Sequence, residues 1–205
     1  MADTTPQSGE GSPGRLPLSA GQIVAAIYRI AFTRPGNHDV FANARVRWFD
    51  FIVPVVLFLV LQVGYETQRD AHLAHVLAIS VRNAEIILGI ITAGILIRLV
   101  VATAVTAVLA YGLASRERVG PGLLGYVWMQ AVLVAPWVMI LRGAFTGNIP
   151  VWMTVVLGFG STLYLIYGAS RVLRVAFGLS NIGLGVLFAL AGSIVSYAVD
   201  RLIPW

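Results

Sequence analysis

The 205-residue chain has no cysteine, no lysine and few charged residues. The lack of cysteine excludes disulfides, thiolate metal sites and cysteine nucleophiles. All 14 basic residues are arginines, which excludes a Schiff-base lysine and a P-loop lysine. Charged residues make up 11% of the chain, whereas a soluble domain carries about 25%. Together with 58% hydrophobic residues and a mean hydropathy of +0.84, this composition indicates an integral membrane protein.

Sequence patterns of common catalytic sites are also lacking. The chain contains no HExxH, no GxSxG, no P-loop and no Rossmann glycine pattern. The net charge of +5 is interpreted as basic loops facing an anionic membrane leaflet, rather than as a nucleic-acid site. We therefore expect no enzyme activity, no cofactor, no metal and no nucleic-acid partner.

The longest apolar run covers residues 86–113 and contains one charge, Arg98. At about 1.5 Å per residue this run is roughly 42 Å long as a helix, whereas a hydrocarbon core is about 30 Å thick. Arg98 then lies near mid-bilayer, where a charge costs roughly 3 kcal/mol. Such a residue is a candidate functional site.

Five apolar segments in all are near the length of a membrane span. The boundaries are marked by Gly120-Pro121-Gly122, by residues 147–150, by Gly178 as a helix stop and by Ser180 as a helix cap. The sequence predicts an all-α integral membrane bundle of five transmembrane helices in residues 49–205, over about 49–66, 86–113, 122–142, 151–169 and 182–200.

Residues 1–17 are rich in Pro, Gly, Ser and Thr and are predicted to form a disordered tail. Residues 18–48 are predicted to form one or two interfacial amphipathic helices. Ser19 and Gln22 fit a capping box at the start of the first. The predicted apolar faces are Ile23, Ala26, Ile27 and Ile30 in the first helix, and Val40, Phe41, Ala44 and Trp48 in the second. These faces fit a membrane surface or ordinary helix packing equally well.

Arginines predict the orientation. With the N-terminus inside, the inner segments hold Arg15, Arg29, Arg34, Arg45, Arg47, Arg116, Arg118, Arg171 and Arg174, and the outer ones hold Arg69, Arg82, Arg142 and Arg201. This excess predicts an inner-membrane protein with a cytoplasmic N-terminus and an outside C-terminus. The expected aromatic belts are Trp48, Tyr111, Tyr126 and Tyr167 inside, and Tyr65, Trp152, Tyr197 and Trp205 outside.

Arg98, Gln62 and Ser196 are predicted to lie at one depth and to form a polar layer. Asp and Glu occur only at the ends of the predicted spans, so none is expected to pair with Arg98 within the chain. Its expected partners are Gln62, water, lipid phosphate, an anionic ligand, a carboxylate from another subunit, or carbonyls freed by Pro54 and Pro136. Three interpretations stay open: a long side chain reaching the interface, a structural or subunit contact, and an anion site.

Two further groups of residues are weaker candidates. Thr106 and Gln130 form a second polar level, expected to make interhelical hydrogen bonds. His72 and His75 are three residues apart in the predicted first outer loop, where a solvated loop is the expectation and a metal site the alternative.

Small residues in the spans are expected to allow close packing within the bundle or between copies: Gly89, Gly94, Gly158, Gly160, Gly183, Gly185 and Gly192.

The segment from Gly122-Leu-Leu-Gly125-Tyr126 to Pro136, with residues 163–167 and 171–180, resembles the Yip family of multispan membrane proteins named for interaction with Ypt/Rab GTPases. The likeness covers roughly residues 45–200 as a pattern. The acidic-Leu-Tyr-Gly-Pro segment of eukaryotic members is replaced here by residues 43–48. The resemblance implies a non-enzymatic scaffold or trafficking-like protein of the bacterial type, and it transfers no functional residue.

Our first functional hypothesis is a non-catalytic Yip-like scaffold that organises protein partners or its own copies among membrane lipids. The alternative is a small oligomeric transporter or channel for an anionic solute, using Arg98 with Gln62. An enzyme acting on lipid ranks last, because only His72, His75 and the inner arginines could serve it.

Overall fold

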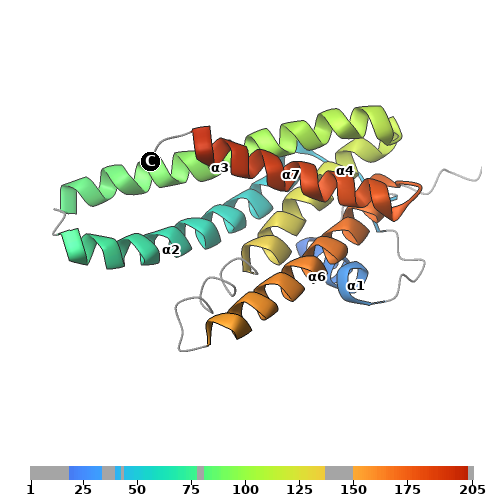
Figure 1. Cartoon of the computed structure of the whole chain (residues 1–205). Helices are drawn as coiled ribbons and strands as arrows, with labels where there is room; N and C mark the ends of the chain where they lie inside the picture. The colour runs from blue at the N-terminus through green and yellow to red at the C-terminus, as the bar shows by residue number, and fades with distance from the viewer. Residues whose placement is uncertain (1–18, 34–39, 43, 78–80, 137–149, 203–205) are drawn as a thin grey trace, which may run out of the picture.

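The structure is a computed structural model that describes residues 19–33, 40–42, 44–77, 81–136 and 150–202 (Figure 1). All regular structure in these ranges is helical, which confirms the all-α class. The predicted tail at 1–17 lies outside the described residues. The helices are α1 (Ala20–Phe32), the 3₁₀ turn η1 (Trp48–Phe51), α2 (Ile52–Leu77), α3 (Val81–Leu113), α4 (Arg116–Met129), the π-helical turn η2 (Gln130–Val134), α6 (Val151–Phe177) and α7 (Ile182–Leu202).

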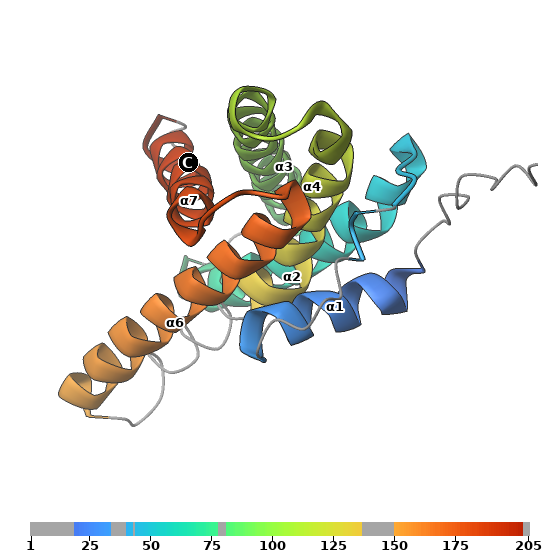
Figure 2. The same cartoon turned by 90° about the vertical axis from the view of Figure 1, so that its right-hand side faces the viewer.

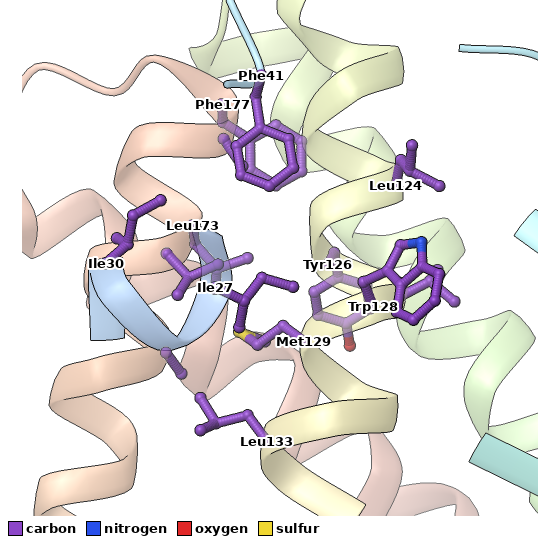
Figure 3. Close-up of a cluster of buried hydrophobic side chains, with 14 of the residues drawn as sticks. Ile27, Ile30, Phe41, Leu124, Tyr126, Trp128, Met129, Leu133, Leu173 and Phe177 are labelled. Carbon is purple, nitrogen blue, oxygen red and sulfur yellow. The ribbon is translucent and has the colours of Figure 1, made fainter. Parts of the chain in front are cut away.

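α4 and η2 form the centre of the molecule. They contact α1, α2, α3 and α6, and most of their side chains are buried (Figure 2). Glycines in α4 allow the close approach of α6, since a Cβ atom on Gly122 would lie 2.1 Å from Cδ1 of Phe177. Apolar side chains from α1, α4 and α6 meet there in one cluster (Figure 3).

Each predicted span falls mainly within a helix, but the first outer loop is predicted wrongly. α2 continues to Leu77 and α3 begins at Val81, so most of the predicted loop is helical. The apolar run ends before the helix does, because Glu, Gln, Arg and Ala are good helix formers in water. α2 and α3 have 26 and 33 residues, so both exceed the roughly 20 residues that a span needs.

The boundary predicted at Gly120-Pro121-Gly122 is also wrong. α4 begins at Arg116, so these three residues lie inside it. Pro121 removes one backbone hydrogen bond of the helix. It is buried in the core, where packing keeps the helix continuous despite this loss. The glycine and proline pattern placed this boundary six residues late.

Three helix ends carry caps of the kind that local sequence favours. Ser19 and Gln22 form the predicted capping box of α1. Gly178 ends α6 with φ 63°, and the N–H of Leu179 donates to the carbonyl of Arg174. The cap of α7 is Asn181, whose Oδ1 accepts from the Leu184 amide at 3.0 Å, rather than the predicted Ser180.

The described part of residues 18–48 contains one α-helix, where one or two were predicted. The predicted apolar face of α1 is buried against α4 and α6, which is the packing interpretation of that face. No helix forms over residues 44–47, and η1 follows as a single turn. Val40, Phe41, Ala44 and Trp48 therefore do not share a helical face: Phe41 is buried, whereas Trp48 is 78% exposed.

Candidate functional site

The predicted polar layer lies on three helices that are neighbours. α3 contacts both α2 and α7, so the helices of Arg98, Gln62 and Ser196 adjoin. Arg98 is half-buried beside the buried Ile95 and Leu99, and Gln62 is half-buried on α2. Arg98 lies 15 residues before the end of α3, roughly 22 Å along its axis. The side chain of Ser196 lies outside the described residues, so a shared layer remains a prediction.

The two prolines differ in their effect on the helix carbonyls. Pro54 is in the first turn of α2, where a missing N–H costs no helical hydrogen bond. Pro136 cannot pair with the carbonyl four residues earlier, that of Val132. This carbonyl, in the π-helical turn η2, accepts a hydrogen bond of 2.7 Å from the Tyr28 hydroxyl of α1. One of the acceptors predicted for Arg98 thus accepts a hydrogen bond from α1.

A second contact holds the C-terminal end of α1. Arg171 of α6 donates from Nη1 to the carbonyl of Ala31 at 3.4 Å and from Nη2 to the carbonyl of Thr33. A cation at a helix C-terminus also interacts favourably with the helix dipole. A Cβ atom on Gly168 would lie 3.3 Å from that of Ala31, so the helices touch closely here. α1 is therefore an integral part of the bundle.

The second polar level contains a buried tyrosine in addition to the two predicted residues. Thr106 and Gln130 both lie beside the hydroxyl of Tyr126, although that hydroxyl makes no hydrogen bond of standard geometry among the described residues. Thr106 is fully buried and bonds the carbonyl of Ala102. Tyr126 was predicted in the inner aromatic belt but is 1% exposed. Its burial requires Gly192 of α7, where a Cβ atom would lie 2.7 Å from the hydroxyl oxygen.

Three chain segments predicted to be cytoplasmic meet at one end of the bundle. A Cβ atom on Gly178 would lie 3.5 Å from Cγ of Arg118, and one on Gly120 would lie 4.0 Å from Cβ of Val46. The corners between α3 and α4 and between α6 and α7 are together at this end (Figure 1). We define the basic end as Arg45, Arg47, Arg116, Arg118 and Arg174, of which all but Arg118 are exposed.

The N-terminal half of α6, away from the basic end, carries exposed apolar side chains. Their spacing of three or four residues places them on one helical face. The N-terminal half of α6 projects away from the other labelled helices in both views (Figures 1 and 2). We define the α6 stripe as Trp152, Val155, Val156, Phe159 and Leu163, each more than 50% exposed.

The remaining candidates have mixed outcomes. His72 and His75 lie within α2 rather than in a loop, and their side chains are outside the description. Among the described residues no group of three metal-ligating side chains occurs. Gly185 packs tightly, with a Cβ atom 2.2 Å from the Ser170 carbonyl oxygen, whereas Gly89 and Gly160 face open space.

Comparison with known protein families, with curated proteins and with solved structures found no match. The resemblance to the Yip family therefore stays a prediction from the sequence.

Proposed function

We propose that this chain is a multispan membrane protein that acts as a non-enzymatic scaffold, with the α6 stripe as its contact surface for protein partners. The membrane part rests on two helical stretches, Leu88–Leu113 and Ile182–Val199, which are long and apolar enough to span a bilayer. Only 28% and 18% of their most apolar windows are buried, whereas the core helix of a soluble protein is mostly buried. In the proposed topology α2, α4 with η2, and α6 supply the other three spans.

The basic end supports the proposed orientation. It gathers arginines from three separate segments, and a cytoplasmic surface carries such an excess. In this orientation the N-terminus is cytoplasmic and the C-terminus is outside, in the inner membrane. Extraction of the membranes with alkaline carbonate, which removes peripheral proteins, tests the membrane location.

The α6 stripe is the single observation that carries the scaffold role. Phe159 is 69% exposed and Trp152 is 68% exposed, and both belong to residue types enriched where proteins bind one another. Lipid alone can cover such a surface, so the proposal needs a test that separates lipid from protein.

Site-specific photo-crosslinking in native membranes provides this test. A photoreactive residue at Phe159 is expected to give discrete protein adducts. The same residue at Val108 of α3, which is 73% exposed, serves as the lipid-facing control. The scaffold proposal fails if both positions give only lipid adducts, and a homo-oligomer is identified if the adduct is a second copy of the chain.

A transporter or channel for an anionic solute is the second candidate, and half-buried Arg98 in a long apolar helix favours it. An intramembrane charge usually marks a substrate or ion pathway. The expected result is anion uptake into liposomes by the wild type and none by a folded Arg98→Leu variant. Equal flux in both proteins excludes this role for Arg98.

A further inference from the structure

The two edges of α1 differ in chemistry. Its polar edge, Ser19, Gln22 and Arg29, borders a shallow recess of about 490 Å³. Ala25, Ala26, Ile30 and Val40 contribute apolar walls, and none of the described residues that line the recess is acidic. A recess of this size is within the range of small-ligand sites.

The aromatic edge adjoins the polar edge on the exposed side of the same helix. Tyr28 stacks on Phe32 at 5.9 Å, and Phe32 stacks on Tyr164 of α6 at 5.5 Å. All three rings are between 39% and 49% exposed. Exposed aromatic rings of this kind favour the boundary between headgroups and acyl chains.

The helix that carries both surfaces is held in a fixed position. Tyr28 holds one side through the Val132 carbonyl, and Arg171 holds the C-terminal turn. Arg29 and Phe32 are three residues apart and both exposed, so their side chains are neighbours on the same side of this fixed helix. A phospholipid has the matching arrangement, because its anionic phosphate lies next to the start of its acyl chains.

We propose that the recess on α1 binds the headgroup of an anionic phospholipid, with Arg29 on the phosphate and the acyl chains along Phe32 and Tyr164. Arginine suits this role because its planar guanidinium can make two hydrogen bonds to phosphate oxygens. The arginines of the basic end add a longer-range attraction to the same leaflet. The proposal rests on the membrane location given above but not on the scaffold role.

The test is a lipid titration of the purified full chain in detergent, with bound lipid counted by native mass spectrometry. Phosphatidylglycerol is the anionic probe and phosphatidylcholine the zwitterionic one. Arg29→Gln is expected to weaken phosphatidylglycerol binding about tenfold, because a charge-assisted hydrogen-bonding partner is lost. Arg29→Lys is expected to retain most of the binding.

Arg174→Gln is the matched control, since it removes one exposed arginine of the basic end outside the recess. It is expected to change binding less than twofold, which separates a specific site from general attraction. Val40→Trp fills the recess without changing the charge and is expected to reproduce the loss seen in Arg29→Gln.

Three outcomes would overturn the proposal. Equal losses in Arg29→Gln and Arg174→Gln would mean diffuse electrostatics, and equal binding of the two lipids would mean no anionic site. Full displacement of phosphatidylglycerol by inorganic phosphate, bound alone with the same affinity, would identify a free-anion site instead. Because the titration needs no partner protein, its failure is distinguishable from failure of the crosslinking experiment.

Discussion

The two halves of α6 each carry a phenylalanine, but the two rings have opposite environments. Phe177, in the C-terminal half, is fully buried and packs on Phe188 at 5.0 Å. Phe159, in the N-terminal half, is 69% exposed. The C-terminal half faces glycines of α4 and α7 that allow contact between helices, whereas around Gly160 nothing lies within 4 Å. Hydrophobicity thus suits both halves to a membrane, whereas small residues on the facing helices determine which half is buried inside the protein.

The largest expected effect comes from truncating the buried ring. Phe177→Ala leaves a cavity at the contact with Gly122 and Phe188 and is expected to lower the free energy of unfolding by about 4 kcal/mol. Phe159→Ala is the control in the same helix, with an expected loss below about 0.5 kcal/mol. Unfolding in mixed micelles, followed by circular dichroism, measures both. Similar losses in the two variants would show that the halves of α6 do not differ as described.

A smaller effect is expected from closing the gap between helices. Gly185→Ala places a methyl group against the Ser170 backbone, which cannot move as a side chain can, and is expected to cost roughly 2 kcal/mol. Gly160→Ala meets no atom within 4 Å and is expected to be neutral or slightly stabilising. The same unfolding measurement applies, and a neutral Gly185→Ala would contradict the close packing of α6 on α7.

The smallest effect concerns the link between α1 and η2. Tyr28→Phe removes the hydrogen bond to the Val132 carbonyl and is expected to cost about 1 kcal/mol. Tyr164→Phe, in the same aromatic stack, removes a hydroxyl for which no such bond is described and is expected to change stability little. Hydrogen exchange of α1 amides provides the local readout. Equal exchange in both variants would mean that packing alone holds α1.

The helices themselves were largely predictable. Their apolar runs lie in α2, α3, α4 with η2, α6 and α7, and the caps at Ser19 and Gly178 were recognised from local patterns. Errors occurred where an apolar run and a helix have different ends, as at Leu77 and Arg116. Membrane thickness limits the length of the apolar run, whereas backbone propensity and packing determine where the helix ends.

The candidate sites were less predictable. Depth along a helix was enough to pair Thr106 with Gln130, and the structure places both beside Tyr126. The direction of Tyr126 could not be inferred, because a tyrosine near a helix end fits either an aromatic belt or a core. The tight contacts at Gly122, Gly125 and Gly168 were not among those expected, since a glycine in a span gives no sign of which helix it faces.

The sequence by itself determined that this chain is helical and strongly apolar and where several helices begin and end. Such features depend on residues within one or two turns of each other. The tertiary structure alone decided that Tyr28 takes the carbonyl freed by Pro136, across 104 residues of sequence, and that Arg171 holds the end of α1. These contacts depend on how helices pack, and packing is set by the shapes of facing surfaces that no single segment contains.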